Sequence, residues 1–285
     1  MKTLKTAFLL TALTLLLLFI GQALGGSNGM AIALVVAIIM NGGAYFFSDK
    51  IAIKSAGAVP ISREESPRLY AVMERLAAKS NLPMPKLYMI PQAAPNAFAT
   101  GRNPSHASVA VTQGLMELMN DDELEGVIAH ELSHVRNYDI LTSSIAATLA
   151  GAITWIGYAG RWGMILGGYG GGDGDRERGG GIAALLMLIL APLAAVLLQL
   201  GISRQREYQA DASGAQMVGH ANGLISALEK LGAYNKRIPM DIPPSTSALC
   251  IVQPLTAREM FSSLFSTHPP LADRIAELRN MTITR

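Results

Sequence analysis

The chain has 285 residues, of which 50 % are hydrophobic and 15 % charged, and its mean hydropathy is positive, at +0.31. This composition is unusual for a soluble domain and predicts membrane-spanning helices. The formal net charge of +2 says nothing about nucleic acid, but the sequence has no basic stripe with interleaved aromatics, so we expect no nucleic-acid partner. A single cysteine excludes an intrachain disulfide.

Two apolar runs without charged residues open the chain, at residues 6–24 and 30–48. Each is long enough to cross the ~30 Å hydrocarbon core of a bilayer. Because only Gly-Gly-Ser-Asn-Gly joins them, residues 1–48 predict a tight transmembrane hairpin. Lys2 and Lys5 before the leucines would also suit a signal peptide, but the run is longer than the apolar core of one.

Residues 140–203 predict a second transmembrane pair. They contain two more apolar runs, at 140–160 and 181–203, and a glycine-rich loop between them that has linker composition. We therefore expect four transmembrane helices. The run at 140–160 is rich in small residues that suit close helix packing, so a buried or membrane-dipping helix of the soluble domain is the alternative.

Basic residues indicate the orientation of these helices. They precede the first apolar run, follow the second and follow the fourth (Lys2, Lys5, Lys50, Lys54, Arg63, Arg68, Arg204 and Arg206). By the positive-inside rule, residues 49–139 and 204–285 face the cytoplasm. Three arginines in the loop at 161–180 weaken this assignment.

The segments at 49–139 and 204–285 are together long enough for one compact core. Ser66-Pro67 predicts the start of a helix that runs to Lys79. A further helix is expected at 113–119, and short strands at 86–90, 97–100 and 108–112. We predict a predominantly α-helical membrane protein with an α+β soluble domain, in which a small, mostly antiparallel sheet lies beside the helix described next.

That helix carries His130-Glu131-Leu132-Ser133-His134. Asn120 and Glu123 form a capping-box pattern, and apolar residues recur at helical spacing from Leu124 to Val135. Charged residues at both ends place the helix outside the membrane. Histidines at positions i and i+4 share one face and can bind one metal ion, with the glutamate beside any water it carries, which is typical of zinc hydrolases. The alternative is an ordinary helix with two unrelated histidines.

A hydrolytic zinc site needs three protein ligands and one open position. After the fourth apolar run, Glu207 and Asp211 are again spaced i, i+4 on a predicted helix. We assign Glu207 as the third ligand of one Zn²⁺ ion per chain, and Asp211 as a carboxylate that orients a ligand histidine. The alternative for this segment is a polar helix at the membrane edge with i, i+4 charge pairs.

The sequences H-E-L-S-H at 130–134 and E-Y-Q-A-D at 207–211 resemble the HtpX family of membrane zinc endopeptidases, which are related to the CAAX prenyl endopeptidases. P-N-A-F-A-T-G at 95–101 and S-T-H-P-P-L-A-D-R-I at 266–275 also match. This resemblance implies a zincin-like catalytic domain with His130, His134 and Glu207 on zinc. It also implies cleavage of misfolded or membrane proteins in quality control at a bacterial-type inner membrane.

The same resemblance implies further site residues. Glu131 would be the general base, Asn96 and Ala97 would lie near a substrate-binding sheet edge, and His268 and Arg274 would stabilise the oxyanion. Alternatively, Asn96 is a turn residue and His268 caps a helix. The expected partners are polypeptide substrates and the lipid bilayer. The functional alternatives are an intramembrane-cleaving protease and a non-catalytic membrane scaffold. The acidic residues at 121–125 oppose the first, because they do not suit a membrane span. The second is opposed because every expected metal-binding position holds a residue that can bind zinc.

Overall fold

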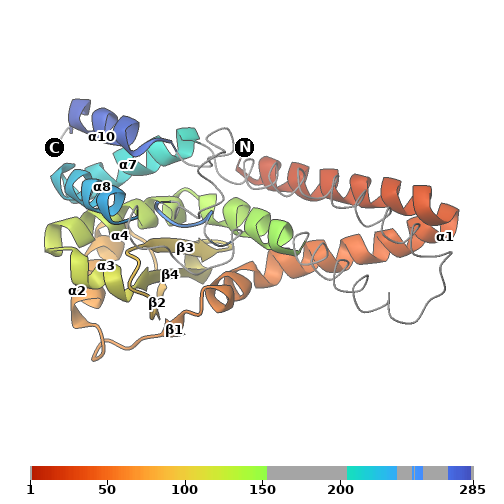
Figure 1. The fold of residues 1–285 in the computed structure, drawn as a ribbon, viewed down its shortest axis with the longest axis horizontal. Coiled ribbons are helices and arrows are strands. Elements are labelled where there is room, and N and C mark those ends of the chain that lie inside the picture. Colours follow the sequence, from red (N-terminus) through yellow and green to blue (C-terminus); the bar gives the residue numbers. More distant parts are fainter. Residues whose placement is uncertain (1, 153–203, 236–245, 247, 253–268, 284–285) are drawn as a thin grey trace, which may run out of the picture.

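The computed structural model describes residues 2–152, 204–235, 246, 248–252 and 269–283 (Figure 1). A long helical hairpin, α1 (Lys2–Ser55), projects from a body that contains a four-stranded sheet and the other labelled helices (Figure 1). The labelled helices of the body are α2 (Pro67–Lys79), α3 (Gln113–Leu118), α4 (Asp121–Arg136), α7 (Arg204–Val218), α8 (Asn222–Asn235) and α10 (Leu271–Asn280).

The chain reverses direction within α1 at Gly25 and Gly26, inside the turn that the sequence predicts. Gly26 has a φ of +58°, a conformation that favours glycine. The two arms also approach closely at Gly29, where an added Cβ would lie 2.2 Å from the carbonyl oxygen of Gly21. Asn41 Nδ2 donates to Thr14 Oγ1 at 2.8 Å across the arms. The second arm runs to Ser55, seven residues beyond the predicted end of the span at residue 48.

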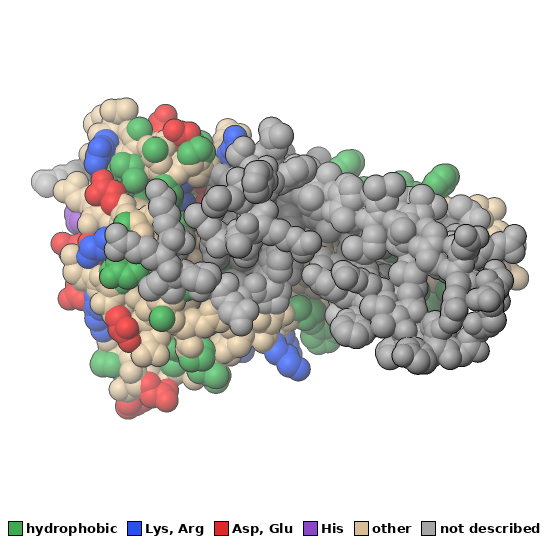
Figure 2. Space-filling model, viewed as in Figure 1, with side chains coloured by type: hydrophobic (Ala, Val, Ile, Leu, Met, Phe, Trp, Pro, Cys, Tyr) green, Lys and Arg blue, Asp and Glu red, His purple; other side chains and the backbone are tan. Residues whose placement is uncertain are grey.

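The outer surface of this hairpin is apolar. Its large exposed side chains include Phe8, Leu15, Phe19, Ile32, Ile38, Ile39, Phe46 and Phe47. On the face in Figure 2, acidic and basic side chains are spread over the body, whereas the described side chains visible along the hairpin are mainly hydrophobic. Within the described residues, one helix, Gly25–Ser55, is long and apolar enough to cross a membrane, and Thr6–Phe19 and Asp139–Ala152 are shorter apolar helices.

Much of the predicted second transmembrane pair lies outside the described residues. The helix Asp139–Ala152 covers the first part of the expected span at 140–160. The remainder of that span, the glycine-rich loop and the expected span at 181–203 are not described. The buried Thr142 hydroxyl lies 2.9 Å from that of Thr6, so Asp139–Ala152 packs against the first arm of α1.

The sheet has the strand order β1-β2-β4-β3, formed by β1 (Val59–Pro60), β2 (Lys86–Ile90), β4 (Ala107–Thr112) and β3 (Ala97–Gly101). The three strands expected from sequence are confirmed, whereas the two-residue β1 is too short to leave a pattern. Two of the three strand pairs are antiparallel, as the expected mostly antiparallel sheet requires, but β2 pairs parallel with β4, so the sheet is mixed. After β2 the chain passes to the edge strand β3, and it then returns as β4 between β2 and β3. Because β4 is antiparallel to β3, it runs in the same direction as β2.

Helix α4 lies at the centre of the body, in contact with β3, α2, α7 and α8. Its apolar residues, from Leu124 to Val135, belong to the main hydrophobic core. The predicted capping box is present: Asn120 Oδ1 accepts from the Glu123 amide, and Glu123 Oε2 accepts from the Asn120 amide, both at 2.9 Å. Packing on several sides therefore fixes the position of the H-E-x-x-H residues.

Candidate metal centre

Three side chains from two helices converge at the centre of the body. The Nε2 atoms of His130 and His134, both on α4, are 3.2 Å apart. The carboxylate of Glu207 on α7 lies 3.7 Å from His130 Nε2 and 3.5 Å from His134 Nε2. The helices can approach this closely because α7 has Gly214 at the contact, where an added Cβ would lie 3.0 Å from the His130 backbone nitrogen.

These distances fit one tetrahedral ion. Two ligand atoms that are each about 2.1 Å from a tetrahedral zinc would lie about 3.4 Å from each other, close to the spacing of the three groups. Two imidazoles and one carboxylate are also a donor set that catalytic zinc sites use, with a fourth position open. The residues present therefore fit a metal ion.

The orientation of His130 is set by a buried ion pair. Its Nδ1 lies 2.8 Å from Asp211 Oδ1, and Arg274 binds Asp211 with two nitrogens, Nε at 2.8 Å and Nη2 at 2.6 Å. The Arg274 charge holds the pKa of Asp211 well below its usual range, although burial opposes this. An ionised Asp211 accepts the Nδ1 proton of His130, which leaves the Nε2 lone pair for a metal.

His134 has a similar partner that the sequence analysis did not identify. Asp139 Oδ2 lies 3.5 Å from His134 Nδ1, and Arg206 Nη1 lies 3.5 Å from Asp139 Oδ1. Each histidine thus faces a carboxylate, and each carboxylate faces an arginine. The signal in the sequence is the carboxylate of Asp139, five residues after His134, among the charged residues at the end of the helix.

Glu131 lies beside this cluster and is 2 % exposed. Burial raises the pKa of its carboxyl, while the two histidines act in the opposite direction. The backbone N–H of Ala99, on the edge strand β3, also acts to lower this pKa. The edge strand therefore lies close to the predicted general base, which could not be inferred from helical spacing.

A model of peptidase family M48 matches residues 63–282, which include all these groups. The chain belongs to peptidase family M48. It is 54 % identical over 274 residues to a protease HtpX homologue of Desulfatibacillum aliphaticivorans, covering 96 % of this chain and 88 % of that protein. It is 49 % identical over 283 residues to one of Pelotomaculum thermopropionicum, covering 99 % and 100 %. The predicted HtpX resemblance is confirmed.

The fold of this M48 chain is also similar to the crystal structure of S. mikatae Ste24p, with a TM-score of 0.51 and 22 % identity. The match covers 97 % of this chain and 64 % of the Ste24p chain, so this protein spans less than two thirds of that one. Family membership and the histidine–glutamate cluster together identify the protein as a metalloprotease.

The structure places the predicted substrate residues of the M48 chain at the start of β3, with Asn96 directly before the strand and Ala97 as its first residue, but not at an open surface. Asn96 is 1 % exposed and Ala97 is fully buried. Asn96 Nδ2 donates to the carbonyl of Val252 at 2.7 Å, and the amide of Ile251 donates to the carbonyl of Ala97 at 2.9 Å. Residues 250–252 of the same chain therefore cover this part of the sheet edge.

Arg274 lies near the predicted metal ligands but is fully buried and faces Asp211. Its Nη1 donates to the carbonyl of Ile251 at 2.9 Å and lies 3.9 Å from Glu207 Oε2. This geometry favours a positioning role over the oxyanion role that the resemblance implies. His268, the other expected oxyanion residue, lies outside the described residues.

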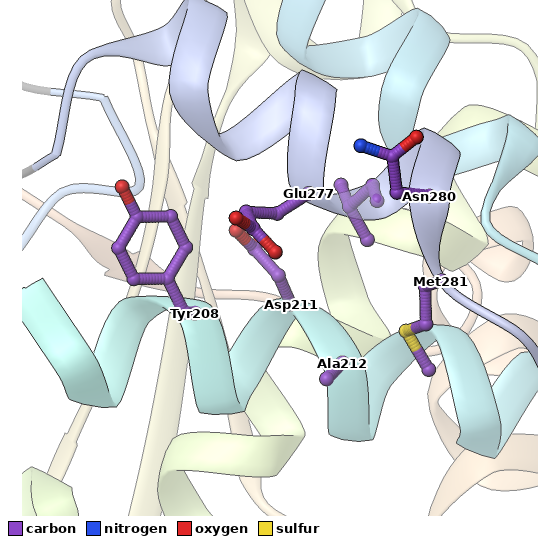
Figure 3. Close-up of a pocket in the computed structure, with 7 residues that line it drawn as sticks. Tyr208, Asp211, Ala212, Glu277, Asn280 and Met281 are labelled. Atoms are coloured by element: carbon purple, nitrogen blue, oxygen red, sulfur yellow. The ribbon is translucent and has the colours of Figure 1, made fainter.

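A pocket of about 190 Å³ opens between α7 and α10 of the M48 chain. Asp211 lines it together with Tyr208, Glu277 and Met281, whose side chains border the same space in Figure 3. None of His130, His134 and Glu207 lines this pocket. We therefore place the chemistry of this M48 protein at the metal cluster and not in the pocket.

Metal binding by this M48 protein is expected to strengthen with pH. Burial acts to lower the pKa of His134, but the charge of Glu207 and the Asp139 hydrogen bond outweigh it and raise the pKa to about 9. In the metal-free protein His134 is therefore protonated at neutral pH, and a metal ion must displace that proton. Zinc affinity, measured by chelator competition, should rise about tenfold per pH unit from neutrality towards pH ~9. An affinity independent of pH would contradict this.

Proposed function

We propose that the protein is an integral-membrane zinc endopeptidase that cleaves misfolded or membrane polypeptides at the cytoplasmic face of a bacterial-type inner membrane. The observation that carries this proposal is the cluster of His130, His134 and Glu207 beside the buried Glu131. M48 membership supports peptide-bond hydrolysis, and the donor set favours zinc. We infer the substrate class from the HtpX relatives, and the orientation in the membrane from the apolar hairpin and the distribution of basic residues.

Each residue of the cluster has a role in the proposed reaction. A zinc ion held by His130, His134 and Glu207 would polarise the scissile carbonyl and make a water molecule nucleophilic near neutral pH. Glu131 takes a proton from the attacking water and delivers it to the leaving amine. The N–H of Ala99 favours the ionised form of Glu131, which is the form that accepts this proton. Asp211 keeps the Nε2 atom of His130 turned towards the site.

The membrane placement rests on the hairpin and on charge. Gly25–Ser55 is apolar and largely exposed to the surroundings of the protein, as a lipid-facing helix would be. We propose a transmembrane hairpin at 1–48, a second transmembrane pair at 140–203 and a catalytic domain built from 49–139 and 204–285. Asp121 and Asp122, at the start of α4, are exposed. Because charged side chains are costly to place in the bilayer interior, we place the catalytic helix in an aqueous environment. This opposes the intramembrane-cleaving alternative.

Metal removal tests the zinc assignment. Chelation should abolish casein cleavage by the purified full-length protein, and added zinc should restore it. Glu207→Ala removes a ligand, so its zinc affinity should fall by more than the 10–100-fold typical of outer-shell partners. Glu229→Ala is the matched control, since Glu229 is half-exposed and pairs with Arg279 on the surface. Full zinc occupancy and activity in Glu207→Ala would assign the ligand role to another residue.

Cysteine labelling in intact cells tests the proposed orientation. Cys250 is buried among apolar side chains, so it is first replaced by alanine. An impermeant thiol reagent should modify a cysteine introduced by Gly171→Cys, in the loop assigned to the outer face. It should spare one introduced by Glu64→Cys, an exposed position in the body. The opposite labelling pattern would place the catalytic domain outside the cell.

A further inference from the structure

Residues 250–252 connect the sheet edge to the metal centre. They are 0 %, 2 % and 8 % exposed, and they lie within the hydrophobic core. On one side, the Ile251 amide donates to the Ala97 carbonyl at 2.9 Å. On the other side, the Ile251 carbonyl accepts from Arg274 Nη1 at 2.9 Å. One peptide segment therefore contacts both the edge strand β3 and the arginine that binds Asp211.

The side chain of Asn96 hydrogen-bonds this segment to the start of β3. Its Nδ2 donates to the Val252 carbonyl at 2.7 Å, and its Oδ1 accepts from the Ala97 amide at 3.0 Å and from the Val252 amide at 3.5 Å. The Asn96 amide and carbonyl are themselves held by Thr112 of the neighbouring strand. A buried side-chain amide with both of its polar atoms bonded within the protein is not available to a substrate.

A continuous path of polar contacts runs from Asn96 to a metal ligand. It passes from Asn96 to residues 251–252, then to Arg274, to Asp211 and to His130 Nδ1, with successive contacts of 2.7, 2.9, 2.6 and 2.8 Å. The guanidinium group is planar, so the Ile251 carbonyl fixes its orientation when the opposite edge binds Asp211. A shift of the segment would turn the Arg274 plane and, with it, the carboxylate that orients His130.

We propose that Asn96 is a positioning residue for the metal centre and not a substrate-binding residue. This inference rests on the proposed function, because it assigns Asn96 to the zinc ligand His130. Asn96 holds residues 250–252 in the place where Ile251 supports Arg274. Through Arg274 and Asp211, it keeps the Nε2 atom of His130 directed at the ion.

Two substitutions and one control test this role in the full-length protein. Asn96→Ala removes the side-chain hydrogen bonds, and Asn96→Asp keeps the size but places a carboxylate against the Val252 carbonyl. Ser144→Ala is the control: Ser144 is buried, and its hydroxyl contacts Thr100 Oγ1 at 2.7 Å and the Gly101 amide at 3.4 Å, at the other end of β3. The readouts are zinc affinity by chelator competition, and kcat and KM for casein cleavage.

Both Asn96 variants should bind zinc about tenfold more weakly. This is the lower end of the 10–100-fold loss of metal affinity that follows when a residue that hydrogen-bonds a metal ligand is replaced. At saturating zinc, KM should stay close to that of the unchanged protein, and Ser144→Ala should keep normal zinc affinity. Normal zinc affinity with a raised KM in the Asn96 variants would overturn the proposal and make Asn96 a substrate contact. An equal loss of zinc affinity in Ser144→Ala would also overturn it, as general loosening of β3. If the unchanged protein bound no zinc, the proposed function itself would fail.

Discussion

Replacing Glu131 with glutamine should reduce peptide hydrolysis to background while the protein retains its zinc. Glutamine has the size of glutamate but cannot accept the proton of the attacking water, so general-base catalysis, typically worth about 10²–10⁴-fold, is lost. Since Glu131 is not one of the three clustered metal-binding groups, zinc content should not change. Casein cleavage by the purified protein, measured beside its zinc content, checks both parts of this expectation.

Glu125→Gln is the matched control for this experiment. Glu125 lies on the same helix, but its carboxylate pairs at 2.8 Å with Arg75, whose side chain is 58 % exposed. Removing this charge should leave both hydrolysis and zinc content near their normal values, because Glu125 is not one of the clustered metal-binding groups and glutamine can still accept a hydrogen bond from Arg75. Near-normal turnover in Glu131→Gln would mean that another group acts as the base. Loss of zinc in that variant would mean that Glu131 is part of the metal site.

The sequence predicted what depends on local spacing. The i, i+4 positions of His130 and His134 are enough to place both rings on one face of α4, and the capping box at Asn120 fixes where that helix begins. The E-x-x-x-D pattern likewise placed Glu207 and Asp211 on one side of α7. Packing between α4 and α7 then brings these faces together, which the structure shows and helical spacing alone does not.

The contacts that orient the site were not predictable, because they join residues far apart in the chain. Arg274 and Asp211 are separated by 63 residues, and Asn96 and Val252 by 156. No pattern in the sequence indicates such pairs. The resemblance supplied Asn96 and Arg274 as site residues but not their partners. Their burial shows that both side chains are bonded inside the protein, and this changes the roles that the geometry favours for them.

Arg274→Ala should strongly destabilise the protein and weaken its metal site. Arg274 is fully buried and carries the charge that compensates Asp211. Removing one partner of a buried ion pair leaves the other charge uncompensated and typically costs about 3–5 kcal/mol. Thermal unfolding and zinc affinity should both reveal the loss. Arg279→Ala, on the exposed side of the same helix, is the matched control and should change the free energy of unfolding by at most about 1 kcal/mol.

Arg274→Lys separates a positioning role from an oxyanion role. Lysine keeps the positive charge but cannot bind Asp211 with two nitrogens while also reaching the Ile251 carbonyl, so Asp211 and His130 should lose their fixed orientation. Zinc affinity should therefore fall by about 10–100-fold, as it does when outer-shell partners are removed. If Arg274 instead stabilised the oxyanion, zinc affinity would stay normal while kcat fell by about 10²–10³-fold. Measuring zinc affinity and kcat on the same preparation decides between the two roles, because the positioning role acts first on the metal and the oxyanion role acts only on the reaction.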